Sequence, residues 1–144
     1  MISEKAAKED LLKEGVGASN FFSWLKGRAQ SFVHAGRGLF VLCLSQWNFR
    51  IHLAAALGAT CLGWSFRISA IEWLILVVTI TLVLTAEALN TALERTVDIV
   101  KASPHPVARD AKDLAAAGVL IASFGSLAVG LIIFGPRLFR FFIG

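Results

Sequence analysis

A stripe of polar side chains interrupts the most apolar part of this 144-residue chain. Glu87, Asn90, Glu94 and Asp98 follow one another at steps of 3, 4 and 4 residues, which places them on one face of an α-helix. Three carboxyl groups on one helix face suit the binding of a hard cation and the abstraction of a proton. Hydrogen bonding between helices is the alternative, although neutral side chains would serve it with a smaller desolvation cost.

The composition indicates the solvent in which this stripe must work. Hydrophobic residues make up 56% of the chain and charged residues only 17%, which is too apolar for an ordinary soluble domain. Three apolar stretches, residues 51–68, 73–93 and 114–134, approach the roughly 20 residues that a helix needs to cross a bilayer. Glu87 falls inside the second stretch, where a charged group facing lipid is unfavourable. The stripe is therefore expected to face protein, water or a cation.

The part of the chain before these stretches has two characters. Residues 1–20 mix Lys with Glu and Asp and lack the apolar segment of a secretory signal, so they are expected to form a polar arm. In residues 21–39, apolar side chains recur at helical spacing opposite a polar face, which predicts an amphipathic helix in the membrane surface or packed on the protein itself. Residues 21–144 are thus expected to form one all-α membrane domain, an N-terminal amphipathic surface helix plus three transmembrane helices.

Basic residues are distributed unequally about the three expected spans. Eleven lie in the N-terminal part and in the loop between the second and third spans, namely Lys5, Lys8, Lys13, Lys26, Arg28, Arg37, Arg50, Arg95, Lys101, Arg109 and Lys112. Only Arg67, Arg137 and Arg140 lie on the other side. Because basic residues favour the cytoplasmic side, the N-terminus and this loop are predicted to be cytoplasmic. The net charge of +4 is interpreted as attraction to anionic lipid headgroups, with no nucleic acid as a partner.

Lys112 and Asp113 form a second group of candidate residues, at the expected cytoplasmic start of the third span. A lysine beside a carboxylate-bound Mg²⁺ would help to neutralise the charge that moves during phosphoryl transfer. An ordinary helix start, with a capping carboxylate and a snorkelling lysine, accounts for the same two residues. Both interpretations stay open on these two residues alone.

Longer motifs around the two groups resemble one known family. The segments EALNTALERTVDIV and HPVARDAKDLAAAGVLI, preceded by SFVHAGRGL and NFRIHLAAAL, are similar to those of the small prokaryotic lipid kinases, which comprise integral-membrane diacylglycerol kinase and undecaprenol kinase. The resemblance covers roughly residues 31–136. It implies a homotrimer of three-span chains in the inner (cytoplasmic) membrane, with active sites at the cytoplasmic surface. It also implies Mg-ATP-dependent phosphorylation of the hydroxyl of a membrane lipid, undecaprenol or diacylglycerol, and NFRIH is more similar to the undecaprenol kinase branch.

The resemblance assigns roles to individual residues as well. It implies that Glu87 is the general base and that Asn90 is its neighbour in the active site. It implies that Glu94 is a Mg²⁺ ligand. The residues that it places at the ATP are Lys112, Asp113 and His105. The resemblance therefore implies that the stripe and the start of the third span belong to one active site.

Gln46 departs from the family pattern. Three residues before Phe49 and Arg50, where this chain has Gln46, the family carries a Glu that supplies a second metal ligand. Because Mg²⁺ usually takes only one or two carboxylates and keeps several waters, a Gln carbonyl or a water is expected to fill the place, with weakened metal binding. The departure also supports an alternative, a non-catalytic membrane scaffold or lipid-binding relative. Mg²⁺-dependent transfer of phosphate to lipid distinguishes the two.

Overall fold

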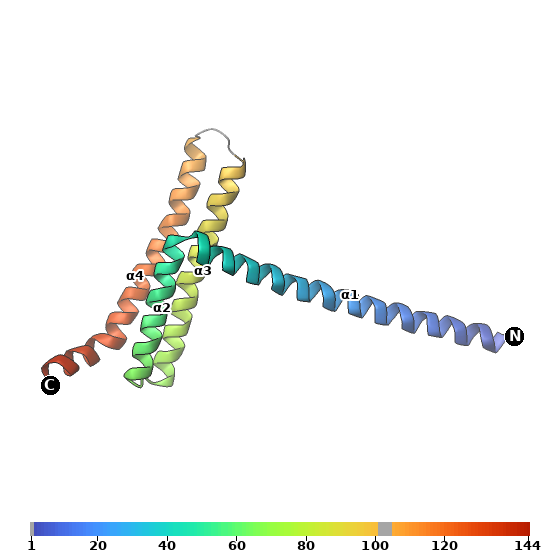
Figure 1. Ribbon diagram of the computed structural model, residues 1–144, viewed down its shortest axis with the longest axis horizontal. Coiled ribbons are helices and arrows are strands. Elements are labelled where there is room, and N and C mark those ends of the chain that lie inside the picture. The colour runs from blue at the N-terminus through green and yellow to red at the C-terminus, as the bar shows by residue number, and fades with distance from the viewer. Residues whose placement is uncertain (1, 101–104) are drawn as a thin grey trace. The chain divides into compact units, whose positions relative to one another are not determined.

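The computed structural model contains helices and short connections throughout the residues it describes (Figure 1). It describes the backbone of residues 2–100 and 105–144, and the side chains of residues 21, 23–100 and 105–144. The helices are α1 (Ile2–Ser45), α2 (Trp47–Ser65), α3 (Ala70–Val100) and α4 (Pro106–Ile143). The chain divides into two units, Met1–Val41 and Leu42–Gly144. The predicted all-α class is confirmed for the described residues.

The first unit consists of α1 as far as Val41. Residues 2–45 contain no proline, so no backbone donor of the helix is missing, and the polar arm expected at residues 1–20 continues into the amphipathic segment as one helix. The rings of Phe21 and Trp24 stack with centroids 6.3 Å apart, and the Arg28 guanidinium lies 5.3 Å from the Trp24 ring centroid. Exposed aromatic and basic groups of this kind suit a helix at the membrane surface, a location that stays a prediction.

The second unit is built on a hairpin of α3 and α4, and α2 lies along it (Figure 1). Gln46 has an extended backbone (φ −110°, ψ 112°), which ends α1 and starts α2. α2 ends at Ser65, before the expected end of the first span at residue 68, and the turn that follows contains Arg67 with a φ of 49°. The buried apolar core of the second unit is formed by Ile68, Leu76, Ile133 and Phe134.

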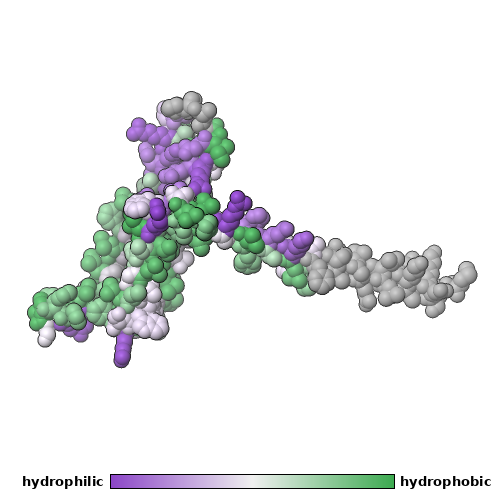
Figure 2. Space-filling view, in the orientation of Figure 1, coloured by the Kyte–Doolittle hydropathy of each residue, from purple (hydrophilic) through white to green (hydrophobic). Residues whose placement is uncertain are grey.

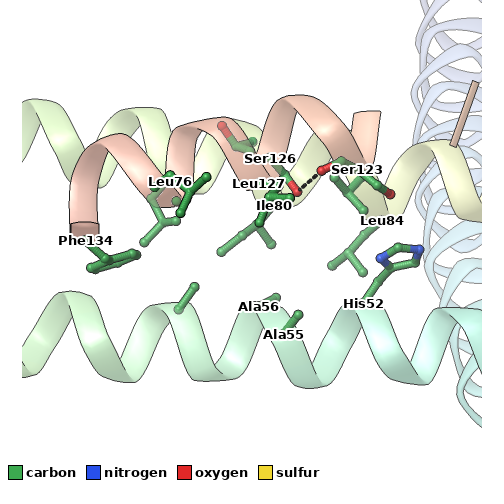
Figure 3. A pocket seen from close by; sticks show the side chains of 15 residues that line it. His52, Ala55, Ala56, Leu76, Ile80, Leu84, Ser123, Ser126, Leu127 and Phe134 are labelled. Atoms are coloured by element: carbon green, nitrogen blue, oxygen red, sulfur yellow. Dashed lines mark hydrogen bonds between the residues drawn. The ribbon is translucent and has the colours of Figure 1, made fainter. Parts of the chain in front are cut away.

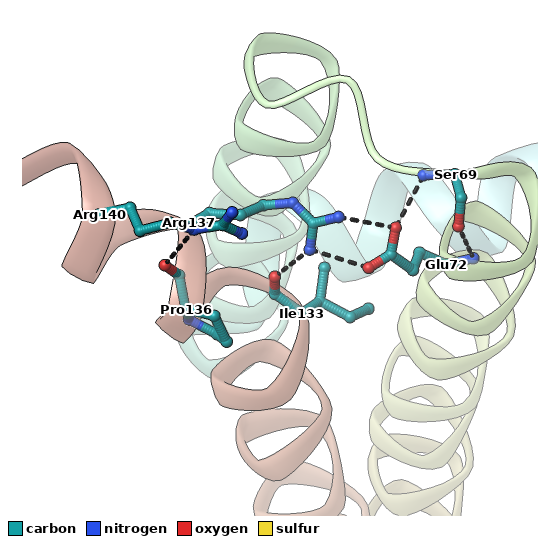
Figure 4. A network of polar contacts seen from close by, with 6 residues as sticks. All are labelled: Ser69, Glu72, Ile133, Pro136, Arg137 and Arg140. Atoms are coloured by element: carbon teal, nitrogen blue, oxygen red, sulfur yellow. Dashed lines mark hydrogen bonds and ion pairs between the residues drawn. The ribbon is translucent and has the colours of Figure 1, made fainter. Parts of the chain in front are cut away.

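A polar network joins the start of α3 to the last turns of α4 (Figure 4). The Ser69 N–H donates to Glu72 Oε2 at 2.7 Å and the Glu72 N–H donates to Ser69 Oγ at 3.3 Å, which is a capping box. Arg137 pairs with the same carboxylate through both nitrogens, at 2.8 Å (Nη1 to Oε1) and 2.9 Å (Nη2 to Oε2). Such a bidentate pair fixes geometry as well as distance, so it joins the start of α3 to the last turns of α4.

The surface of the hairpin is suited to a membrane. α3 and α4 each contain a stretch that is long and apolar enough to cross a bilayer, and only 17% of each stretch is buried within the chain. A core helix of a soluble protein would be mostly buried. Figure 2 shows hydrophobic side chains along most of the hairpin and hydrophilic ones gathered where α3 ends and α4 begins. Two of the three expected spans thus correspond to long apolar helices, and the span expected at residues 51–68 stays a prediction.

Gly63 allows α2 to pack closely against the start of α3. A Cβ atom at this position would lie 3.0 Å from Ile68 Cδ1 and 3.0 Å from Trp73 Cη2. Gly63→Leu is therefore expected to lower the free energy of unfolding by about 1–3 kcal/mol, because an overpacked site forces its neighbours to move. Gly58→Leu is the matched control on the same helix, since no described atom beyond its own stretch of helix lies within 4 Å of its Cβ position. Denaturant unfolding in detergent micelles measures both variants, and equal losses would contradict the close packing at Gly63.

Candidate active site

The polar stripe lies on α3 and passes from a buried to an exposed environment. α3 is continuous through all of its residues, which confirms the helical spacing predicted for them. Glu87 and Asn90 are only 2% and 7% exposed, whereas Glu94 is half-buried and Asp98 is exposed. The buried carboxyl group therefore lies toward the apolar part of α3, and the exposed one lies at its polar end.

Three oxygen atoms at the buried end of the stripe lack partners. Asn90 Nδ2 donates to Glu94 Oε1 at 3.2 Å, which orients the Glu94 carboxylate. In contrast, Glu87 Oε2, Asn90 Oδ1 and Thr91 Oγ1 are buried without a hydrogen-bond partner in the described part of the chain. An unpaired buried polar atom costs about 1–3 kcal/mol, and such atoms in folded proteins are normally paired. Their concentration on one helical turn indicates that a ligand or another subunit supplies the partners.

Thr91 is a candidate site residue that the sequence does not single out. It follows Glu87 by four residues, so it lies on the same side of α3, and it is 4% exposed. Threonines in apolar helices commonly bond to the carbonyl four residues earlier, so the residue type alone carries no signal. Only its spacing from Glu87 points to the site.

α2 contributes a second ionisable group near Glu87. His52 is half-buried, and it lines an apolar cavity together with Leu84, which precedes Glu87 by three residues on α3. The His52 side chain points toward the interior of the α2–α3–α4 bundle (Figure 3).

An apolar slot of about 400 Å³ runs between α2, α3 and α4 (Figure 3). His52 and Leu84 line one end of this slot, and Leu76 and Phe134 line the other. The side of α2 is formed by small residues, Ala55, Ala56 and Ala59. Leu84 precedes Glu87 by three residues on α3, so the His52 end of the slot is the end nearest to the buried carboxyl group. The slot is elongated along the helices and mostly hydrocarbon-lined, which suits an alkyl or prenyl chain.

The start of α4 brings one of its predicted site residues to the stripe. Lys112 Nζ forms an ion pair with Asp98 Oδ1 across the hairpin, so a basic group lies at the exposed end of the stripe. Asp113 instead pairs with Arg109 on the surface of α4, with 3.8 Å between Asp113 Oδ2 and Arg109 Nε. His105 is the exposed N-cap residue of α4 and makes no capping bond with its side chain. Lys112 is thus joined to the stripe, whereas Asp113 and His105 make no such contact within the described residues.

Comparison with known proteins identifies the family. Residues 33–134, well over half of the chain, match the family described as prokaryotic diacylglycerol kinase. The chain belongs to this family. It is 42% identical over 109 residues to an undecaprenol kinase of Bacillus subtilis, an alignment that covers 76% of this chain and 89% of the relative. It is 39% identical over 101 residues to a diacylglycerol kinase of Synechocystis, which covers 69% of this chain but only 58% of that relative. The chain is therefore an integral-membrane lipid kinase.

In this kinase, Gln46 lies at the junction of α1 and α2. Its side chain is half-buried and makes no capping hydrogen bond. The preceding residue, Ser45, accepts a 2.7 Å hydrogen bond from Arg95 Nη2. Since Arg95 directly follows Glu94, this bond holds the junction at the level of the Glu94 turn of α3. Gln46 thus follows a residue that is bonded to the turn of α3 after Glu94, and a shared role of Gln46 and Glu94 at one metal stays a prediction.

The residues of the lipid kinase also offer oxygen donors for a magnesium ion. No group of three or more His, Cys, Asp and Glu side chains lies together in the part of the chain that the structure describes. Mg²⁺ is commonly held by one or two carboxylates together with substrate phosphates and waters, so a complete protein cage is not required. Glu94, the unpaired Asn90 Oδ1 and the Gln46 side-chain carbonyl are all hard oxygen donors. This donor set fits a cation that is shared with a bound nucleotide.

Proposed function

We propose that this lipid kinase transfers the γ-phosphoryl group of ATP, with Mg²⁺, to the hydroxyl of undecaprenol or diacylglycerol. The observation that carries the proposal is the buried Glu87 carboxyl group, which has an unpaired oxygen and follows Leu84, a residue lining one end of an apolar slot, by three residues on α3. A membrane kinase needs this combination, because its acceptor is a polar hydroxyl on a hydrocarbon chain. At the other end of the same stripe, Asp98 is exposed and pairs with Lys112 of α4. This polar end suits the binding of a water-soluble phosphate donor.

The hydrocarbon of the acceptor would occupy the slot and its hydroxyl would reach Glu87. The lipid O–H donates to Glu87 Oε2, and the carboxylate takes its proton as the lipid oxygen attacks the γ-phosphorus. The bond between this phosphorus and the bridging oxygen of ADP breaks, so the products are a phosphorylated lipid, ADP and a proton on Glu87. His52 at the end of the slot would help to exclude water from the hydroxyl and to orient the carboxyl group.

The nucleotide would lie across the polar ends of α3 and α4. The Lys112 ammonium, held beside Asp98, would neutralise charge on the phosphates. Asp113 and His105 are on the exposed surface of the α4 start, where they would contact the remainder of the nucleotide. When bound, Mg²⁺ would neutralise the phosphate charge and align the reacting groups, held by Glu94 with Gln46 as a weak second ligand. Asn90 keeps Glu94 in place through its side-chain amide.

The surrounding assembly is part of the same proposal. We infer a homotrimer of three-span chains in the inner membrane, with the N-terminus and the active site on the cytoplasmic side. The wide apolar exposure of α3 and α4 supports contacts with other subunits and with lipid. The excess of basic residues around the polar end of the hairpin supports the orientation.

Phosphorylation of a panel of lipids by the purified 144-residue chain tests the proposal. Labelled Mg-ATP is supplied with undecaprenol or with diacylglycerol in mixed micelles, and label in the extracted lipid is counted. Undecaprenol is expected to be the better acceptor, since the relative whose length is 89% covered is an undecaprenol kinase. Label in neither lipid would contradict the proposed function, and preference for diacylglycerol would reverse the choice of acceptor.

Filling the slot with a larger side chain is expected to weaken the binding of the lipid acceptor and not that of ATP. Ala56→Phe places a ring in the slot from α2, so the KM for lipid should rise about tenfold while the KM for ATP stays unchanged. Ala54→Phe is the matched control, because Ala54 is exposed and is absent from the slot lining. Steady-state kinetics with each substrate varied in turn measure both constants. Equal effects of the two variants on the lipid KM would remove the slot from the acceptor site.

A further inference from the structure

Thr91 differs from four other threonines of the bundle in how its hydroxyl is used. Four other threonine hydroxyls donate to the carbonyl four residues earlier, at 2.7 to 2.8 Å, and these are Thr60, Thr79, Thr81 and Thr96. Thr91 Oγ1 is buried and makes no hydrogen bond within the described chain. A buried hydroxyl that forgoes the local bond available to its neighbours costs stability. Its orientation therefore requires a partner outside the chain.

The position of Thr91 on α3 locates that partner. At about 100° per residue, Asn90 lies on one flank of the line from Glu87 to Glu94, and Thr91 lies on the other. The Asn90 amide nitrogen already bonds Glu94. Thr91 is thus the buried polar group on the flank opposite Asn90, between the proposed base and the proposed metal ligand, where the proposed function places the phosphoryl group.

Hydrogen-bond chemistry selects the kind of partner. Three buried oxygens are unpaired in the described residues. The Asn90 carbonyl oxygen and the oxygen of an ionised Glu87 can only accept a hydrogen bond, whereas the Thr91 hydroxyl can donate one. The lipid hydroxyl supplies a donor to Glu87, but the non-bridging oxygens of a phosphoryl group are acceptors and need donors. Thr91 is the buried unpaired group that meets this need.

We propose that the Thr91 hydroxyl donates a hydrogen bond to a non-bridging oxygen of the phosphoryl group during transfer. The inference rests on the proposed kinase function and adds a catalytic residue to it. As the lipid oxygen bonds to the γ-phosphorus and the bond to the ADP oxygen breaks, charge spreads over the equatorial oxygens. A donor already fixed at that place stabilises this charge without reorganising. Thr91 keeps its own proton throughout, because Glu87 takes the proton of the lipid.

Substitution at Thr91 separates this role from a structural one. Thr91→Val keeps the shape and removes the hydroxyl, so kcat is expected to fall about 10- to 100-fold with little change in the lipid KM. Its thermal stability in micelles should be unchanged or higher, because an unpaired buried hydroxyl is lost. Thr91→Ser should restore kcat to within about threefold, since it supplies the same donor. Thr96→Val is the matched control, because Thr96 is exposed and bonded to its own helix, and it should leave kcat unchanged.

The readouts are steady-state kinetics, ATP binding, thermal unfolding and the oligomeric state from light scattering in detergent. Full kcat in Thr91→Val, with an active wild type, would overturn the Thr91 assignment and leave the proposed function standing. Loss of stability or of oligomeric state in parallel with kcat would also overturn it, because the hydroxyl would then bond a neighbouring subunit. If Thr91→Val fails to fold, Thr91→Ala and Thr91→Ser are compared, since they differ by the hydroxyl alone, and equal kcat values would overturn it. An inactive wild type would refute the proposed function itself, and this inference with it.

Discussion

Glu87→Gln is expected to lower the rate of lipid phosphorylation by at least about 100-fold, the usual contribution of a general base. The amide keeps the shape of the side chain but cannot take the proton of the lipid hydroxyl. ATP binding should be nearly unchanged, because Glu87 lies at the buried end of the stripe and Lys112 at the exposed end. Rates of labelled phosphate transfer and equilibrium ATP binding measure the two effects separately.

Glu72→Gln is the matched control for this prediction. Glu72 is also a carboxylate of α3, but it is paired with Arg137 at the other end of the helix. Its loss is expected to reduce thermal stability and to leave the rate per folded molecule unchanged. If Glu87→Gln retained more than about a tenth of the wild-type rate, Glu87 would not be the base. The unpaired Glu87 oxygen would then be explained by a contact with another subunit.

The helical stripe could be predicted from the sequence because its information is local. Spacings of three and four residues determine which side chains share a helix face, and α3 bears this out at Glu87, Asn90 and Glu94. The all-α class and two of the long apolar helices followed in the same way from composition. Lys112 was predicted near the stripe, and its pair with Asp98 brings it there.

Features that depend on several helices at once could not be predicted. The slot is lined from α2, α3 and α4 together, and no single segment carries its pattern. The orientation of His52 depends on how α2 packs, and the unpaired state of Thr91 depends on a local bond that is not made.

The helical continuation of α1 through residues 2–20 was also not predicted. Their mixed charges lack the apolar periodicity that indicates a helix packed on other parts of a protein.

Glu94 is the only carboxylate proposed to hold the magnesium ion, because Gln46 stands where the family has a Glu. Glu94→Ala removes the full carboxylate that is expected to hold the cation, and the Mg²⁺ concentration for half-maximal activity should rise about 100-fold. Unit charges about 4 Å apart attract by roughly 4 kcal/mol at an effective dielectric of 20, and a divalent ion doubles this gross term. Dehydration removes much of it, and a net loss of about 2.7 kcal/mol corresponds to the 100-fold change. Direct titration of metal binding in the presence of a non-hydrolysable ATP analogue provides a readout that is independent of turnover.

Gln46→Glu tests whether the junction of α1 and α2 belongs to the same metal site. The bond between Arg95 and Ser45 holds this junction at the level of Glu94, so an added carboxylate should strengthen metal binding by about 1–2 kcal/mol after desolvation. The half-maximal Mg²⁺ concentration should then fall about five- to thirtyfold. Gln30→Glu adds the same charge on an exposed part of α1, and it should have no such effect. If the gain in Gln46→Glu disappears when Glu94→Ala is added, both residues act on one ion. A gain that persists without Glu94 would mean that Gln46 acts elsewhere, through the general charge of the surface, and no gain at all would mean that its side chain faces away from the metal.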